Sequence, residues 1–304
     1  MRGFAVVVLA VSSVLALGGC GQLPSGIDGN LTNGWPAMPA AKVPVPQSGK
    51  CYSELPSSQD WAINLSPVPC TGPHYSETVF VGTFTGADSA AFTPPGAGTQ
   101  ARASAFDQCR KNTTDYVGGD FMLGRMNLGL VLPGPKAWTG GARWFRCEVT
   151  RYTNLNFDKE LTDNAGSVRD GLRGTRPLAL TCATDTADGK GAIVDEQVAD
   201  CAQPHNAEFA GLFTAPTSPW PSGAEARHNL ALDGCEGVVA SYLGLTTGKI
   251  TNPVLGWLAD NFDQNQWVLG NRTVRCFALG FNGDSPNGVR FTGSVKGIGT
   301  RAPK

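Results

Sequence analysis

The stretch PCTGPHYSETVFVGTF at positions 69–84 returns in a second version, DCAQPHNAEFAGLF, at positions 200–213. In both, a cysteine precedes a Pro-His pair, and a glutamate then leads into a run of aromatic and β-branched residues. Such runs favour strands, so each stretch predicts a turn that opens into a strand. The matching residues are Cys70, His74 and Glu77 in the first version, and Cys201, His205 and Glu208 in the second.

Eight cysteines fall into two sets of four with similar spacing. Cys51, Cys70, Cys109 and Cys147 are separated by 19, 39 and 38 positions, and Cys182, Cys201, Cys235 and Cys276 by 19, 34 and 41. The pattern Cys-x6-Tyr-x-Gly recurs at the third cysteine of each set. The pattern Trp-x4-Arg-x2-Arg-Cys recurs at the fourth and includes Arg146 and Arg275. Landmarks that recur in the same order indicate an internal duplication.

The residues around the later cysteines predict the remaining elements of each copy. Apolar positions at helical intervals over 99–119 and 224–245 place the third cysteine on a helix. Alternating residues over 142–152 and 272–281 place the fourth cysteine on a strand. We therefore expect an α+β fold of two tandem homologous small domains, each stapled by disulfides.

The domain boundaries follow from composition and from the repeated landmarks. We expect a signal peptide at 1–19, a flexible tether at 20–48, and the first domain copy at 49–152. A polar linker at 153–177, the second copy at 178–285 and a C-terminal tail at 286–304 complete the chain.

The disulfide pairing is open from sequence, because four cysteines permit three pairings. We expect Cys51 to pair with Cys147 and Cys70 with Cys109. The first and fourth cysteines lie in expected strands at the two ends of the domain. The second copy would repeat this as Cys182 with Cys276 and Cys201 with Cys235.

The N-terminus has the pattern of a secretory signal peptide. One arginine at position 2 precedes an apolar run from Phe4 to Leu17, which is shorter than the roughly 20 residues of a membrane-spanning helix. The end of the run, Leu17-Gly18-Gly19-Cys20, resembles the bacterial lipobox. This resemblance implies cleavage before Cys20 and a diacylglyceryl group on its sulfur, hence a protein on the extracytoplasmic face of the cell membrane. The alternative is an ordinary signal peptide with Cys20 near its cleavage site.

Charge excludes one class of partner. The 304-residue chain has a formal net charge of −1 and no long basic run, so it lacks the footprint of a nucleic-acid-binding protein. Setting Cys20 aside leaves eight cysteines, an even number, as expected of an exported protein whose thiols pair.

The combined landmarks resemble the septum formation domain of actinobacterial secreted and membrane proteins. The resemblance rests on the Gly49-Lys50-Cys51 opening, the Cys-x2-Pro-His motif, the cysteine on a helix, and the late Trp-Arg-Cys strand. The second copy opens with Leu180-Thr181-Cys182 instead of Gly-x-Cys. The resemblance implies a role in division or envelope growth and transfers no catalytic residue.

The Pro-His motifs allow two interpretations. His74 with Glu77, and His205 with Glu208, have residue types that bind zinc, but the neighbouring cysteines are expected to be oxidised. We therefore expect a structural role in which each glutamate pairs with an arginine such as Arg146 or Arg275. No metal or other cofactor is predicted. A partner site that uses the histidines stays the other possibility.

The sequence predicts a non-catalytic binding or scaffolding protein of the envelope. No G-x-S-x-G, S-x-x-K or H-E-x-x-H motif is present. Trp35, Trp61, Trp220 and Trp257 lie outside the repeated landmarks and offer a binding face for an envelope protein or a cell-wall glycan, whereas Trp138 and Trp267 recur in register and are expected in the core. The alternative is an envelope hydrolase or transferase with a carboxylate or His/Glu site.

Overall fold

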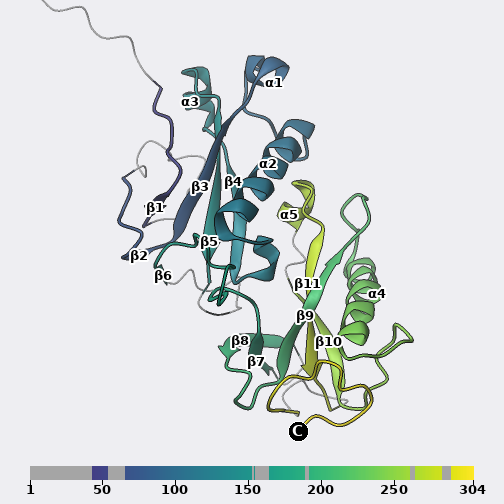
Figure 1. Cartoon of the computed structure of the whole chain (residues 1–304). Helices are drawn as coiled ribbons and strands as arrows, with labels where there is room; N and C mark the ends of the chain where they lie inside the picture. Colours follow the sequence, from purple (N-terminus) through teal and green to yellow (C-terminus); the bar gives the residue numbers. More distant parts are fainter. Residues whose placement is uncertain are drawn as a thin grey trace, which may run out of the picture. The chain divides into compact units, whose positions relative to one another are not determined.

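Two antiparallel sheets, each packed against one long helix, form the framework of the protein in the computed structural model (Figure 1). The structure describes residues 43–53, 66–152, 154, 164–188, 192–260, 264–282 and 289–304. The predicted signal peptide, Cys20 and most of the predicted tether lie outside these residues. Among the described residues, no helix combines the length and the apolar character needed to cross a membrane.

The sheet of the N-terminal half, residues 43–179, has the strand order β1-β3-β5-β4. Helix α2 (Gln100–Val117) packs on β3, β4 and β5. It begins after Thr99, whose hydroxyl accepts a hydrogen bond from the amide of Arg102, and it ends at Gly118 in the left-handed conformation. The strands are β1 (Lys50–Tyr52), β3 (Ser76–Thr83), β4 (Met126–Val131) and β5 (Trp144–Arg151).

Short elements connect these strands. Helix α1 (Gly86–Ala90) follows β3, and the single 3-10 turn η1 (Phe121–Leu123) precedes β4. Helix α3 (Pro135–Thr139) starts with proline, which suits the first turn of a helix because it needs no amide donor there. Strands β2 (Pro73–His74) and β6 (Asn164–Ala165) form a separate two-stranded pair.

The sheet of the C-terminal half, residues 180–304, has the order β10-β11-β9-β7-β8. Helix α4 (Ala224–Tyr242) packs on β9, β10 and β11, and α5 (Gln264–Val268) precedes β11. The strands are β7 (Cys182–Ala187), β8 (Ile193–Ala199), β9 (Ala207–Thr214), β10 (Leu255–Asp260) and β11 (Thr273–Gly280).

The two sheets share one topology. Taking β7, β9, β11 and β10 as the counterparts of β1, β3, β5 and β4, the strand orders coincide, and β8 is an addition at one edge. The strands predicted after the Pro-His motifs, the strands predicted at the fourth cysteines and the helices predicted at the third cysteines are confirmed. The overall α+β class is also confirmed.

All eight cysteines of the two sets form disulfides, but the predicted pairing is wrong. The bonds join Cys51 to Cys70, Cys109 to Cys147, Cys182 to Cys201, and Cys235 to Cys276. The reason lies in the strand order: β3 separates β1 from β5, so Cys51 and Cys147 are not on neighbouring strands. Cys51 instead lies beside the segment before β2, where Val68, two residues before Cys70, forms a β-bridge with Cys51. Helix α2 packs on β5 and places Cys109 beside Cys147.

The described parts of the segments predicted as linker and tail are packed against the two halves. Val168 and Leu172 of the predicted linker, and Leu178 directly after it, are buried in the core of the N-terminal half. Phe291 and Val295 are buried in the core of the C-terminal half. The described part of 164–178 therefore completes the first half, and residues 289–304 complete the second.

The edge strand β4 contacts residues of the C-terminal half. The guanidinium of Arg275, almost fully buried, donates to the carbonyls of Met122, Gly124 and Met126 at 3.0, 3.0 and 2.7 Å. The Gln266 side-chain amide donates to the Leu128 carbonyl at 3.1 Å. These donors satisfy carbonyls that face away from the rest of the β4 sheet.

Candidate functional site

Hydrogen bonds from each histidine to the nearby backbone stabilise the Pro-His turns. His74 is 3% exposed, and its Nδ1 lies 2.8 Å from the Gly72 carbonyl oxygen. His205 is fully buried, with Nδ1 2.7 Å from the Gln203 carbonyl oxygen and its ring 4.6 Å from that of Phe291. Each imidazole thus bonds to the backbone two residues before it, which agrees with the structural interpretation.

Glu77 is the centre of a buried polar cluster. Its carboxylate accepts hydrogen bonds from the Tyr116 hydroxyl, from the Ser167 hydroxyl at 2.7 Å and from the Val168 amide at 2.8 Å. Burial, and then the bond to Glu77, raise the pKa of Tyr116 to about 12. The carboxylate therefore ties the strand β3, the end of α2 and the loop after β6 to one another.

Glu208 repeats this arrangement in the C-terminal half. It accepts from the Tyr242 hydroxyl at 2.6 Å, the Ser294 hydroxyl at 2.6 Å and the Val295 amide at 2.7 Å. Burial and the bond to Glu208 raise the pKa of Tyr242. The same kinds of donor, on matching elements, surround both glutamates. In each half the glutamate thus holds a later segment of the chain against the strand that follows the Pro-His motif.

The chemistry of the first cluster does not suit a metal ion. Donor atoms of Cys51, His74 and Glu77 lie within 4.8 Å of one another. Cys51 is bonded to Cys70, so its sulfur is no thiolate, and Glu77 is occupied by three hydrogen-bond donors. A thiolate and a free carboxylate are the forms that bind zinc.

The arginines predicted to pair with these glutamates have other partners. Arg146 lies 3.3 Å from Glu148, which is buried, and its guanidinium lies 5.1 Å from the ring centroid of Tyr52. Arg275 bonds to the carbonyls beside β4 and lies 3.8 Å from Asp260. The predicted pairing of Glu77 with Arg146 and of Glu208 with Arg275 is wrong, because serine, tyrosine and backbone donors already surround both carboxylates.

The sequence held a further repeat that would have shown these donors. Gly-Ser-Val followed by a basic residue occurs at 166–169 and again at 293–296. In both places the serine and the valine amide bind the glutamate. The basic residues, Arg169 and Lys296, lie 4.0 and 6.0 Å from the ring centroids of Tyr116 and Tyr242.

An acidic cluster lies on β7, β8 and β10. Asp185 is opposite Glu196 in the β7–β8 register, and Asp195 and Asp260 act on both through their charge. Burial first, and then these like charges, raise the pKa of Asp185 to about 7 and that of Glu196 to about 9. Both carboxyls are therefore held protonated at pH values at which exposed ones are ionised.

This cluster predicts that the protein loses stability as the pH rises. Unfolding returns Asp185 and Glu196 to ordinary pKa values of 3.8 and 4.5, so the folded state binds more protons between these values and about 7 and 9. The stabilisation is complete at low pH and is lost as the pH passes the folded pKa values. We expect the melting temperature to fall by more than about 10 °C from pH 5 to pH 9 at constant ionic strength.

The control for this pH effect is a pair of neutral variants. Asp185→Asn combined with Glu196→Gln is expected to flatten the profile, whereas Asp170→Asn, at a carboxyl that is half exposed, leaves its slope unchanged. A melting temperature that rises toward pH 9 in the unmodified chain would contradict the shifted pKa values.

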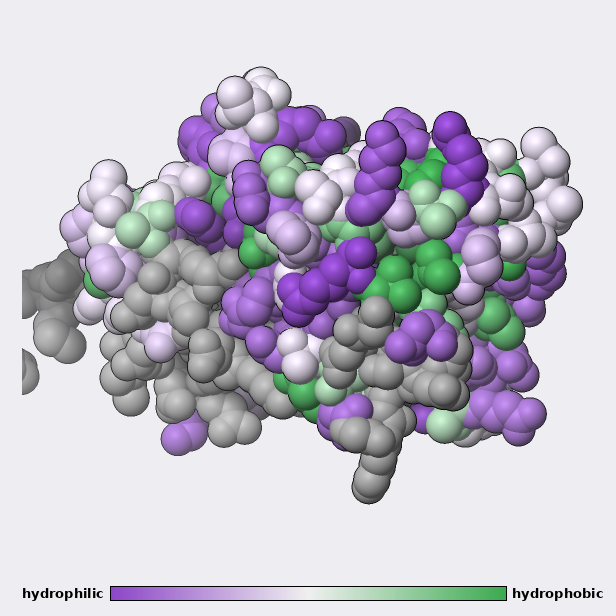
Figure 2. All heavy atoms as spheres, turned by 90° about the horizontal axis from the view of Figure 1, so that it is seen from below, coloured by the Kyte–Doolittle hydropathy of each residue, from purple (hydrophilic) through white to green (hydrophobic). Residues whose placement is uncertain are grey.

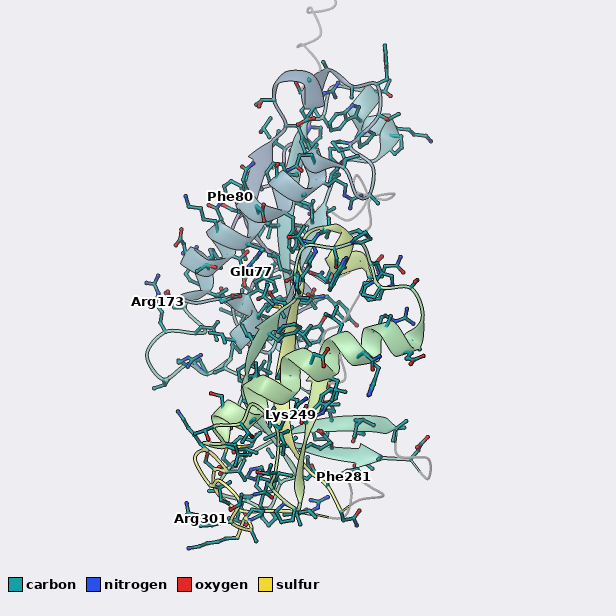
Figure 3. The ribbon with its side chains drawn as sticks, turned by 90° about the vertical axis from the view of Figure 1, so that its right-hand side faces the viewer. Glu77, Phe80, Arg173, Lys249, Phe281 and Arg301 are labelled. Carbon is teal, nitrogen blue, oxygen red and sulfur yellow. A yellow bond between two sulfur atoms is a disulfide. The ribbon has the colours of Figure 1, made fainter. Side chains whose placement is uncertain are left out.

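A groove of about 580 Å³ lies at the edge of the C-terminal sheet. Trp257 and Leu258 on β10, Phe281 after β11, Ile193 on β8 and Ala231 on α4 supply its apolar surface. In Figure 3, Phe281 is labelled below α4, near the strands of the C-terminal sheet. The volume of the groove is in the range of sites that bind small ligands or peptide side chains.

Polar groups of the groove are basic or aromatic. Arg227 and His228, in the first turns of α4, lie at its rim, and the His228 ring is 5.9 Å from that of Trp257. No acidic residue lines the groove in the described part of the chain. Figure 2 shows that the face of the molecule seen from below carries hydrophobic surface bordered by hydrophilic side chains.

The core assignment of two tryptophans is confirmed, and the two described tryptophans outside the repeated landmarks differ from each other. Trp138 and Trp267 are buried, at 0% and 3% exposure, which confirms their assignment to the core. Trp257 lines the groove, whereas Trp220 packs edge-on against Trp267 at 5.6 Å. Trp35 and Trp61 lie outside the described residues.

Comparison with known proteins gives one result. No curated protein and no solved structure matches the chain. The sequence model described as "Septum formation" matches residues 48–276, a single range that runs through both halves and covers more than half of the chain. The chain therefore belongs to the septum formation family.

Proposed function

We propose that this chain is a lipid-anchored, extracytoplasmic binding or scaffolding protein of the bacterial cell envelope, without catalytic activity, that acts in septum formation or cell-wall growth. Membership of the septum formation family links it to cell division or the envelope. The four disulfides are typical of exported proteins. They support export across the membrane, which a lipid anchor at Cys20 would require.

The apolar groove carries the binding part of the proposal. Apolar and aromatic side chains that are exposed in a defined groove are typical of a binding site, because exposed apolar surface favours association. The two Pro-His-Glu corners, by contrast, are occupied internally by hydrogen bonds. An envelope protein and a cell-wall glycan are the two partner classes that the groove's aromatic surface suits.

Membrane anchoring is tested by Cys20→Ser in the native host. We expect this variant to leave the membrane fraction. Two acyl chains anchor a protein stably in the membrane, whereas a protein without acyl chains is held there only by weak contacts. Ser12→Ala, within the apolar run, is the matched control and should stay with the membrane. A Cys20→Ser protein that is exported and still sediments with the membrane would show that the lipid is not the anchor.

The acidic cluster supports a second candidate, an envelope hydrolase or transferase. Carboxyls with raised pKa values serve as general acids in many enzymes. Purified chain incubated with cell-wall material is expected to release no fragments, in keeping with the binding function. Release that Glu196→Gln abolishes would favour the enzyme.

A further inference from the structure

The groove surrounds an open strand edge. β10 pairs with β11 on one side, and on the other it pairs with no strand in the part of the chain that the structure describes. β8 is the opposite edge of the same sheet, and its first residue, Ile193, lines the same groove. The groove is therefore lined by the edge strand β10 and by the first residue of the opposite edge strand, β8.

At the corresponding edge of the N-terminal half, side chains of the C-terminal half cover the outward backbone carbonyls. Leu130 on β4 is opposite Cys147, and Ala259 on β10 is opposite Cys276, so the registers of β4 and β10 match. Trp257 therefore occupies the position of Leu128, and Leu255 that of Met126. In β4 the carbonyls at these two positions accept hydrogen bonds from Gln266 and Arg275.

The same alternation gives β10 a row of outward backbone groups. In an antiparallel strand, alternate residues direct both N–H and C=O away from the paired neighbour. For β10 these residues are Leu255, Trp257 and Ala259. Unpaired groups of this kind are a template for another strand, and proteins usually blunt such edges with charge, proline or a covering segment. Over Leu255–Ala259 the sequence of β10 contains no charged residue and no proline, and no strand among the described residues covers this edge; its one charged residue, Asp260, is the last of the strand.

We infer that β10 binds an extended peptide segment of a partner protein by strand addition. Main-chain hydrogen bonds to Leu255, Trp257 and Ala259 hold the segment, and its alternate apolar side chains enter the groove between α4 and β8. Arg227 and His228, the basic side chains that line the groove on the α4 side, select an acidic side chain on the part of the segment that lies away from Asp260 at the end of β10. This inference rests on the proposed binding function and specifies its partner.

The probe is a synthetic octapeptide that alternates valine and threonine and carries one glutamate. The protein is the full chain with Cys20→Ser, and binding is followed by fluorescence polarisation and by hydrogen exchange of the β10 amides. We expect saturable binding with slower exchange at Leu255, Trp257 and Ala259. The same peptide with alternate N-methylated amides should bind at least tenfold more weakly, because it cannot pair along one edge.

Two variants of the protein sharpen the test. Ala259→Pro removes an outward amide and leaves the β11 pairing intact, as proline allows on an edge strand, so a loss of at least tenfold in affinity is expected. Ala259→Gly retains the amide and should bind within about twofold of the unmodified chain. Arg227→Glu should prefer a peptide in which lysine replaces the glutamate, a reversal that a merely structural role of Arg227 would not produce.

Three outcomes would overturn the inference. Equal binding of the N-methylated peptide would exclude strand pairing. A concentration-dependent dimer abolished by Ala259→Pro would make a second copy of this chain the occupant. Competition by a fatty acid, without protection of β10 amides, would assign the groove to an acyl chain. None of these outcomes bears on membrane anchoring or septum formation, so a failure here is distinct from a failure of the proposed function.

Discussion

Replacing both Cys109 and Cys147 with alanine is expected to lower the free energy of unfolding by about 4 kcal/mol, the chain-entropy value for a loop of this length. Replacing both Cys51 and Cys70, which close a loop of 19 positions, should cost about 3 kcal/mol. The bond between Cys109 and Cys147 also lies in the core between α2 and β5, where both cysteines are buried. Urea denaturation followed by circular dichroism measures both values.

Single substitutions decide the pairing itself. Cys109→Ala should free the thiol of Cys147, and Cys235→Ala should free that of Cys276, as alkylation and peptide mapping would show. If Cys109→Ala instead freed Cys70, the pairing expected from the sequence would be correct and the strand order would be in error.

Glu77→Gln is expected to destabilise the protein by about 3 kcal/mol. The amide of glutamine places a donor against the Tyr116 hydroxyl, the Ser167 hydroxyl or the Val168 amide, and leaves buried donors unsatisfied. Glu208→Gln should have a similar effect, because its carboxylate has the same three kinds of donor. Both effects are measured by equilibrium denaturation.

The control for these variants is Glu225→Gln, at an exposed carboxyl in the first turn of α4. Its expected effect is about 0.5 kcal/mol. Hydrogen exchange adds a local measurement: Glu77→Gln should speed exchange at Val168 and Leu172, whose amides hold the loop after β6 to the rest of the half. Unchanged exchange there would contradict the role of Glu77 in holding this loop.

The repeated landmarks were sufficient to predict the elements and their recurrence. The Pro-His strand, the helix with the third cysteine and the final strand depend on local patterns, which the sequence carries at each position. The disulfide pairing depends on which strands are neighbours, a property of the whole sheet. With β3 between β1 and β5, a bond from Cys51 to Cys147 is excluded, and nothing in the spacing of the cysteines reveals that order.

The glutamate clusters and the groove differ in how well each could be predicted from the sequence. The Gly-Ser-Val repeats at 166–168 and 293–295 were visible in the sequence, but they lie in segments whose polar composition is typical of a linker and a tail. The groove was predictable only through Trp257 as an unrepeated tryptophan. Its other side chains come from four separate elements, so only the folded chain brings them together.

A role in septum formation is tested by the spacing of septa in the native host after deletion of the gene, measured with a fluorescent cell-wall label. We expect delayed septation and longer cells, with normal spacing restored by the unmodified chain and not by Cys20→Ser. A fluorescent fusion should concentrate at the septum. Normal septa in the deletion strain, together with a uniform distribution of the fusion, would contradict a role in septum formation.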